Sequence, residues 1–304
     1  MRLIWHVILV YQYELKNMQQ NNIGWLHGLL GVIIFAGSMP ATRLAVSGFS
    51  PEFLTGARAV LAAGFAILCL IYCKQTLPNF KQIKSLLIIA FGVVFGFPFF
   101  TALALQDMTA ARALVFVALL PLATALFAVL RAGERPSIKF WLAALTGSSF
   151  IILFMWQQDN QRLNLTADLY MLIAIFACGL GYAEGGQLSK QLGGWQVICW
   201  ALVLALPGML VLAGWYFPPN LADISLAAYA GLIYVSLFSM LIGFFFWYKG
   251  LALGGVARVG QIQLVQPFLG LMLCAIFLNE AIEISMILVC CAVILCVFYA
   301  KKHA

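Results

Sequence analysis

Two stretches of equal length share one pattern, and together they indicate the architecture. Residues 109–137 read TAARALVFVALLPLATALFAVLRAGERPS, and residues 255–283 read GVARVGQIQLVQPFLGLMLCAIFLNEAIE. One offset of 146 residues pairs an arginine, a proline and a glutamate, namely Arg112 with Arg258, Pro121 with Pro267, and Glu134 with Glu280. Three matches at one offset indicate an internal repeat, so the chain consists of two homologous halves.

The repeat extends upstream of these stretches. At the same offset Leu105 matches Leu251, and Phe99 and Phe100 match Phe245 and Phe246. A second offset of 142 residues gives weaker matches that pair Gly37 with Gly179, Ala41 with Ala183, and Ser47 with Ser189. These matches place most of the chain within the repeat.

The composition excludes a water-soluble domain. Charged residues make up 9 % of the 304 residues, against about a quarter in soluble domains, and hydrophobic residues make up 64 % with a mean hydropathy of +1.02. A membrane-spanning helix needs about 20 apolar residues, so this length holds about ten spans. The apolar runs are continuous and do not alternate, which favours helices over a β-barrel.

The predicted fold class is therefore an all-α integral membrane protein with ten transmembrane helices. The expected spans are residues 25–47, 53–73, 84–105, 110–131, 138–156, 168–189, 195–217, 226–248, 256–279 and 283–300. Five spans per half is an odd number, so the second half must enter the membrane from the opposite side. The sequence predicts two inverted five-helix repeats over residues 25–157 and 166–300, preceded by a tail over residues 1–24.

Charge placement predicts the orientation, because Lys and Arg are retained on the cytoplasmic side. With the N-terminus inside, 13 basic residues face the cytoplasm: Arg2, Lys16, Lys74, Lys81, Lys84, Arg131, Arg135, Lys139, Lys190, Lys249, Arg258, Lys301 and Lys302. The opposite side holds Arg43, Arg58, Arg112 and Arg162. Both termini are expected in the cytoplasm of an inner-membrane protein. The tail is interpreted either as a disordered or interfacial segment or as an upstream extension of a chain that begins at Met18.

These motifs resemble a known family. The pattern around AARA, the mid-helix proline and GERPS, repeated as GGVARV, QPF and LNEAIE, resembles the EamA-type branch of the drug/metabolite transporter superfamily, as do GSMPATRLAV and GARAVLA. The resemblance implies ten helices in two inverted repeats and a central cavity lined by spans one, three, four, six, eight and nine. It also implies transport of amino acids, other metabolites or toxic compounds, with relatives that carry nucleotide sugars or lipid-linked sugars.

Several polar or kinked positions are candidates for the transport path. Pro121 and Pro267 lie mid-span at equivalent positions and would free the carbonyl groups of Val117 and Gln263, either as paired flexible kinks or as static packing kinks. Gln263 and Gln266 share one face of a span, where their amides would bind a polar substrate or join neighbouring helices. Thr42 is a further candidate for the pathway.

Three sets of side chains keep two interpretations each. Glu184 lies inside a span, so it is either a proton relay on the pathway or part of an ion pair with Lys249 or Lys190. Arg43 and Arg58 are expected either to extend to the outward-facing side of the membrane and anchor their helices there, or to form an outer gate with Glu52, Asp107 or Glu280. Tyr182 and Trp247 would stack on a substrate or belong to an interfacial aromatic belt.

Other function classes fit poorly. The eight cysteines lie in apolar runs without metal-ligand spacing, and the three histidines lie outside the span interiors, so neither a metal site nor a catalytic residue is expected. No nucleotide-binding loop, other cofactor or nucleic-acid site is expected. The inverted repeat predicts a secondary-active transporter driven by a solute gradient or by protons, and the resemblance implies an exporter of amino acids, related metabolites or toxic compounds. The alternatives are a flippase-like carrier of lipid-linked sugars or lipids, and a membrane subunit that does not transport. The protein is expected to be a monomer or a weak homodimer.

Overall fold

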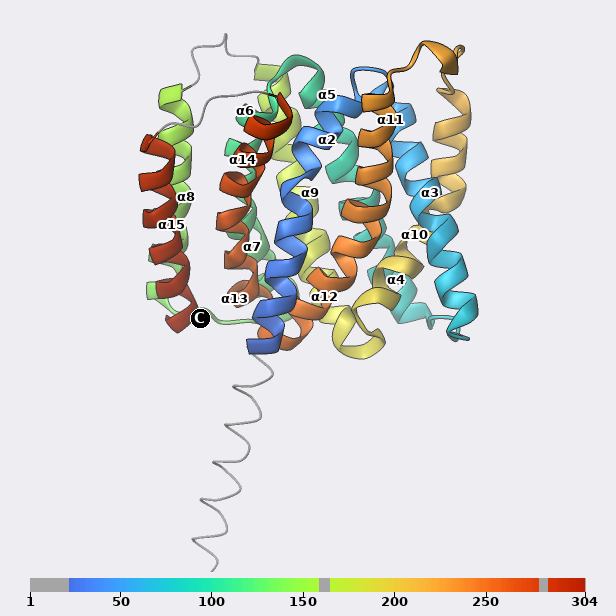
Figure 1. The fold of residues 1–304 in the computed structure, drawn as a ribbon. Coiled ribbons are helices and arrows are strands. Elements are labelled where there is room, and N and C mark those ends of the chain that lie inside the picture. Colours follow the sequence, from blue (N-terminus) through green and yellow to red (C-terminus); the bar gives the residue numbers. More distant parts are fainter. Residues whose placement is uncertain (1–21, 159–164, 279–283, 304) are drawn as a thin grey trace, which may run out of the picture.

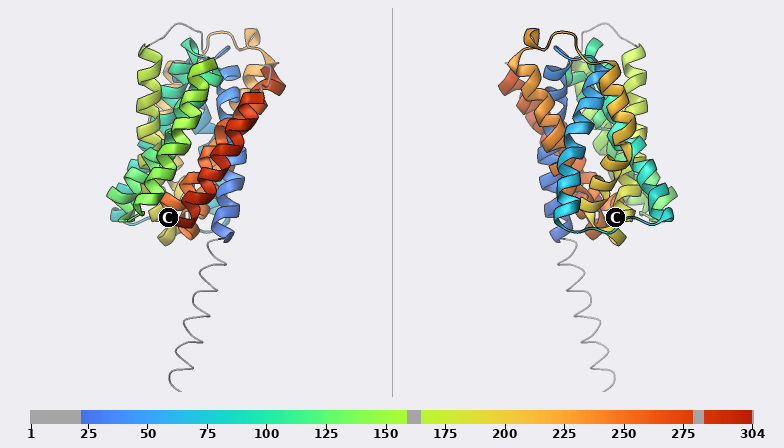
Figure 2. Two further views of the ribbon diagram at one scale, coloured as in Figure 1. Left: turned by 90° about the vertical axis from the view of Figure 1, so that its left-hand side faces the viewer. Right: turned by 90° about the vertical axis from the view of Figure 1, so that its right-hand side faces the viewer.

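The structure is a computed structural model, and it describes residues 22–158, 165–278 and 284–303. The expected tail over residues 1–24 lies almost entirely outside the described residues. Helices run side by side, roughly along one axis, and the chain ends near the same side of the bundle at which the first helix begins (Figures 1 and 2). We call that side the lower end, following Figure 1. The all-α prediction is confirmed for the described residues.

The elements of the first half follow one another with short connections. They are the helix Asn22–Ala45, whose upper part is α2 (Ser38–Ala45), then α3 (Pro51–Tyr72), α4 (Phe80–Ile89), η1 (Ala90–Gly96), α5 (Phe97–Asp107), α6 (Ala110–Val117), α7 (Leu120–Ala132) and α8 (Ile138–Gln158).

The second half repeats this order. It comprises α9 (Leu165–Leu192), α10 (Gly194–Trp215), η2 (Leu221–Asp223), α11 (Leu226–Ile233), η3 (Tyr234–Ile242), α12 (Gly243–Gly254), α13 (Val256–Gly260), η4 (Gln261–Val265), α14 (Gln266–Leu278) and α15 (Ile284–His303).

Helix starts recur at the offset found in the sequence. The pairs α4 and α11, α5 and α12, α7 and α14, and α8 and α15 each begin 146 residues apart. In Figure 1 the helix Asn22–Ala45 rises from the lower end, whereas α9, which opens the second half, descends towards it. The internal repeat is therefore present in the backbone, and the two halves begin from opposite ends of the bundle.

One wide turn occurs in each half at equivalent places. The π-helical segment η1 directly precedes α5, and the π-helical segment η3 directly precedes α12. A π turn contains an extra residue per turn and frequently occurs at functional sites. The sequence pattern did not indicate these two turns.

The two prolines interrupt their helices as expected. Helix α6 ends at Val117 and α7 begins at Leu120, while α13 gives way to the 3-10 segment η4 before α14 begins at Gln266. The expectation of a free carbonyl at Gln263 is wrong, because the tighter 3-10 turn lets the backbone N–H of Gln266 donate to it. Near the first break, the Ser148 hydroxyl donates to the Ala118 carbonyl at 3.0 Å.

Seven helices in the described residues are long and apolar enough to cross a membrane. They are Asn22–Ala45, Pro51–Tyr72, Phe80–Asp107, Leu165–Leu192, Gly194–Trp215, Leu226–Gly254 and Val256–Phe277. Helix α3 shows the pattern expected of a bilayer as solvent, since it turns small side chains such as Ala62 and Ala66 inward while Phe65 and Leu68 are 50 % and 63 % exposed. Large apolar side chains on the outside identify the surroundings as lipid.

Glycines let several helices approach backbone to backbone. A Cβ atom added at Gly250 would lie 2.6 Å from the backbone nitrogen of Gly28, and one at Gly24 would lie 2.7 Å from that of Gly254. The Asn22–Ala45 helix and α12 therefore cross at a contact made of small residues on both sides, as in other close helix pairs in membranes.

Candidate functional site

A small cavity lies where both halves meet. Its volume is about 20 Å³, room for about one water molecule, so the interior is occluded. Four polar residues line it, namely Ser38, Arg58, Ser239 and Gln266. The apolar lining consists of Phe35, Val93, Phe97, Leu120, Tyr182 and Phe244.

The cavity brings together the features that the repeat predicts. Leu120 and Gln266 are the first residues of α7 and α14, so each lies beside one of the matched prolines. Val93 belongs to the π turn η1 and Ser239 to the π turn η3. The two backbone irregularities of each half thus lie at the cavity wall. The helices that line the cavity are those that the resemblance implied, with the addition of α3, which contributes Arg58.

The polar groups form contacts across the cavity. The hydroxyl oxygens of Ser38 and Ser239 are 2.8 Å apart, which joins the two halves. The Gln266 side-chain amide donates to the Phe35 carbonyl at 3.4 Å, while its oxygen Oε1 is buried without a partner. An unpaired acceptor in a buried site is costly and is available to a ligand.

Arg58 lies in an unexpected place. Its side chain is 5 % exposed and lines the cavity, although an outer gate or a snorkelling anchor was predicted. Its Nη2 donates to the Val235 carbonyl in η3 at 3.2 Å, and its Nε is buried without a partner. Arg58 shares the inward face of α3 with Ala62 and Ala66, and that alanine stripe is the sequence signal that identifies its direction.

Aromatic rings form much of the apolar wall of the cavity. The ring centroids of Phe35 and Phe244 are 5.1 Å apart, and those of Tyr182 and Phe244 are 5.8 Å apart. Trp247 packs behind Tyr182 with centroids 5.2 Å apart, is fully buried and does not line the cavity. Of the two aromatic candidates, Tyr182 alone reaches the cavity wall.

Two predicted pathway residues lie next to the site. The Thr42 hydroxyl is buried and donates to the Ser38 carbonyl at 2.7 Å, so it supports a lining residue without lining the cavity. Gln263 is fully buried in η4, and both polar atoms of its side chain lack a partner. Ser38 and Ser239 were missed in the sequence, where a hydroxyl within an apolar run gives a weak signal.

Charged contacts between the halves close the lower end. Glu134, after α7, accepts hydrogen bonds from the backbone N–H groups of Val256 and Ala257 at 2.7 and 2.8 Å, and so caps α13. Arg131 donates to Glu184 at 2.9 Å. The predicted partners Lys249 and Lys190 are wrong, because α7 brings Arg131 to the carboxylate from the other half.

The upper end is closed by polar and apolar contacts. The two nitrogens Nε and Nη2 of Arg112 donate to the Asp168 carboxylate, with a closest distance of 2.8 Å. Arg43 donates to the Leu105 carbonyl, and neither Glu52 nor Asp107 forms a described ion pair with it. Glu280 lies outside the described residues. A cluster that includes Phe49, Phe53, Leu54, Ala228 and Leu232 packs α2, α3 and α11 together.

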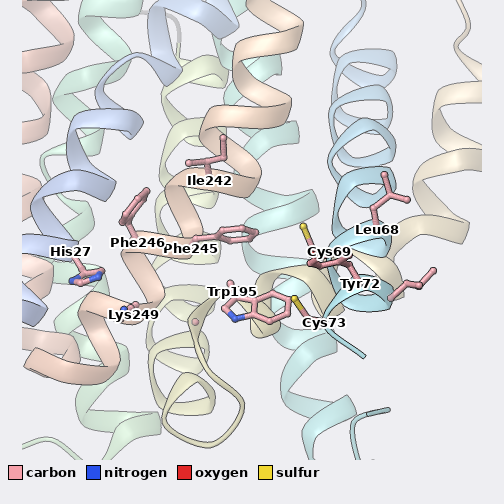
Figure 3. A pocket seen from close by; sticks show the side chains of 12 residues that line it. His27, Leu68, Cys69, Tyr72, Cys73, Trp195, Ile242, Phe245, Phe246 and Lys249 are labelled. Carbon is pink, nitrogen blue, oxygen red and sulfur yellow. The ribbon is translucent and has the colours of Figure 1, made fainter. Parts of the chain in front are cut away.

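A larger crevice of about 940 Å³ lies on the lower outer flank, between α3, α10 and α12 (Figure 3). Its lining includes Leu68 and Tyr72, which are 63 % and 88 % exposed, and its most polar lining side chains are His27 and Lys249. The lining is mostly apolar and faces the surroundings of the bundle. Polar groups converge in the central cavity instead, which makes that cavity the candidate site.

No group of three or more His, Cys, Asp or Glu side chains that could hold a metal ion occurs among the described residues. The arrangement offers hydrogen bonds, one buried cation and an aromatic wall. Such a set can bind and release a small solute within a bundle that is closed at both ends.

Comparison with known proteins gives consistent matches. The model of the EamA-like transporter family matches residues 22–156 and 165–300. The chain is 52 % identical over 287 residues to the uncharacterized transporter YdeK of Bacillus subtilis (strain 168), which covers 94 % of this chain and 100 % of that protein. It is 21 % identical over 261 residues to the uncharacterized transporter YdfC of the same organism, with 84 % and 82 % covered. A crystal structure with 17 % identity and a TM-score of 0.73 covers 92 % of this chain and 99 % of that chain, a likeness of fold alone.

Proposed function

Because the chain belongs to the EamA-like transporter family, we propose that it is a secondary carrier that moves a small solute through the central cavity by alternating access. The observation that carries this proposal is the occluded cavity between two repeated halves, with separate closing contacts at its lower and upper ends. Two structurally similar halves can exchange conformations, so that first one end opens and then the other.

We also propose that ten membrane helices form two inverted repeats of five. Seven of them meet the criteria of length and apolarity. The remaining three are α6 with α7, α8 and α15, and their assignment is supported because α7 and α8 begin 146 residues before α14 and α15. The excess of Lys and Arg at the lower end supports an inner-membrane location with both termini in the cytoplasm.

In this proposal the carrier exports amino acids, related metabolites or toxic compounds. The purified protein, reconstituted in liposomes, is tested with radiolabelled amino acids by counterflow, in which an unlabelled solute inside drives entry of the labelled one. We expect saturable counterflow for at least one candidate and none in protein-free liposomes. Absence of saturable flux for the whole panel contradicts the proposal.

Gln266→Ala is expected to raise the half-saturating substrate concentration roughly fivefold, because a hydrogen bond contributes about 1 kcal/mol. The exposed Gln191 gives a matched control, since Gln191→Ala removes an amide outside the cavity and leaves transport unchanged. Equal kinetics of Gln266→Ala and the wild-type protein would restrict Gln266 to helix packing.

Proton coupling through Glu184 makes a separate prediction. Glu184→Gln is expected to retain counterflow and to lose accumulation driven by a pH gradient, because the amide cannot carry the proton. Arg131→Gln is the control, since it breaks the same ion pair and keeps the carboxylate. If Glu184→Gln accumulates solute in response to the pH gradient as the wild-type protein does, the relay role is wrong.

The flank crevice favours a flippase-like carrier as the second candidate. A lipid-linked cargo needs a lateral opening, and the crevice of about 940 Å³ between α3, α10 and α12 offers an apolar one. A fluorescent-lipid scrambling assay in the same liposomes separates the two functions, because a soluble-solute carrier gives counterflow without lipid transfer.

A further inference from the structure

Arg58 is a buried cation with which no carboxylate of the described residues pairs. Among the Lys and Arg side chains whose burial is described, Arg58 alone is buried. None of the described carboxylates forms an ion pair with it. A charge within a membrane bundle is expensive, and side chains of this kind mark substrate or ion pathways.

The hydrogen bonds of Arg58 leave most of its capacity unused. A guanidinium group has five N–H donors, and the described structure gives Arg58 one hydrogen bond, to the Val235 carbonyl. Arg58 lines the cavity, and its Nε lies buried without a partner. A planar guanidinium group with unused donors matches the geometry of a carboxylate.

The other cavity groups complement this guanidinium group. The hydrogen-bonded pair of Ser38 and Ser239 keeps one O–H to donate to a ligand, and the ring wall of Phe35, Tyr182 and Phe244 offers an apolar surface. No acidic residue lines the cavity in the described part of the chain, so an anionic group entering it meets a cation and a neutral hydroxyl donor, while the unpaired oxygen Oε1 of Gln266 can accept from a donor group of the same solute. Burial strengthens this attraction because few water molecules screen it.

We propose that Arg58 binds a carboxylate group of the transported solute, and that it thereby selects small organic acids with an apolar part over neutral or cationic analogues. This proposal rests on the proposed carrier function, because it assigns the cavity to the cargo. The ion pair forms when the open cavity admits the solute, and while the site is occluded it gives Arg58 the anion partner that no described carboxylate supplies.

The test measures equilibrium binding in detergent, which needs no transport. Benzoate, benzamide and benzylammonium share one ring and differ in charge, and isovalerate with isovaleramide forms a second pair. We expect each acid to bind the wild-type protein at least roughly tenfold more tightly than its amide, and benzylammonium to bind most weakly. Equal binding of acid and amide, or no binding of either acid, overturns the proposal.

Variants separate binding from a structural role in capping the Val235 carbonyl. Arg58→Gln should reduce the ratio of acid affinity to amide affinity to about one. Arg58→Lys keeps the positive charge and should retain part of the preference for the acid. Lys84→Gln removes one exposed positive charge and should keep the full preference. A preference that persists in Arg58→Gln, with only a lower melting temperature, assigns Arg58 to packing.

The outcomes also distinguish this proposal from the carrier function. If binding prefers acids but liposomes show no flux of any solute, the site stands and the carrier function fails. If liposomes transport acids and amides equally well and Arg58→Gln does not change the ratio, the carrier function stands and the role of Arg58 is wrong. If Arg58→Gln does not fold, the wild-type acid and amide pairs still decide the proposal.

Discussion

Glu134→Ala is expected to lower the free energy of unfolding by about 2 kcal/mol and to loosen the lower end of the bundle. The carboxylate accepts hydrogen bonds from two backbone N–H groups at the start of α13, and losing such an N-terminal cap costs about 0.5 to 2 kcal/mol. Gly255, at a φ of +86°, turns the chain so that both N–H groups face the carboxylate. Helix α13 is five residues long, and Val256 and Ala257 are buried at its start, so these two hydrogen bonds satisfy N–H groups that water does not reach.

Amide hydrogen exchange provides the direct measurement. The amides of Val256 and Ala257 should exchange at least roughly tenfold faster in Glu134→Ala, because their protection then depends on local opening alone. Glu134→Gln keeps one uncharged acceptor, so the two amides should exchange at rates between those of the wild-type protein and those of Glu134→Ala. Glu52→Ala removes a carboxylate from the first turn of α3, away from α13, and should leave both amides protected. Unchanged exchange at both amides in Glu134→Ala would show that the cap does not hold α13.

Gly250→Ala is expected to destabilise the protein by about 2 kcal/mol, in the range seen for overpacked interiors. The added Cβ would lie 2.6 Å from the backbone nitrogen of Gly28 and 2.9 Å from the carbonyl oxygen of Gly24. Both neighbours are backbone atoms, so relief requires α12 and the Asn22–Ala45 helix to separate. The small-residue contact between the two halves would then be lost.

Gly64→Ala is the matched control, because no atom lies within 4 Å of its added Cβ. Alanine is the better helix former by roughly 0.8 to 1 kcal/mol, so this variant should unfold at an equal or higher temperature than the wild-type protein. Thermal unfolding in detergent compares the two variants directly. If both shift the melting temperature in the same direction by the same amount, close contact at Gly250 does not limit stability.

The sequence predicted much of the fold because membrane helices have a strong and simple signal. Long apolar runs gave the helices, and the offset of 146 residues gave the repeat that the starts of α7 and α14 follow. The prolines predicted the two helix breaks. The wide turns η1 and η3 were beyond prediction, because hydropathy does not record which carbonyl an N–H group bonds.

The candidate site was predicted less completely than the fold. Gln266 and Tyr182 line the cavity, while Trp247 and Thr42 lie behind it. The depth of Arg58 along its helix suggested the outer surface, but the direction of its side chain follows the alanine stripe of α3. The partner of Glu184 depends on how α7 packs on α9, and contacts between distant segments leave no trace in one sequence.

The occluded cavity has room for about one water molecule, whereas any organic cargo displaces several. In the proposed alternating-access cycle, opening either end draws solvent inward and closing expels it, so that the hydration of the cavity changes with every turnover. Sucrose and similar osmolytes are excluded from protein surfaces and favour the drier form. Osmotic stress is therefore expected to act on the proposed cycle independently of the cargo.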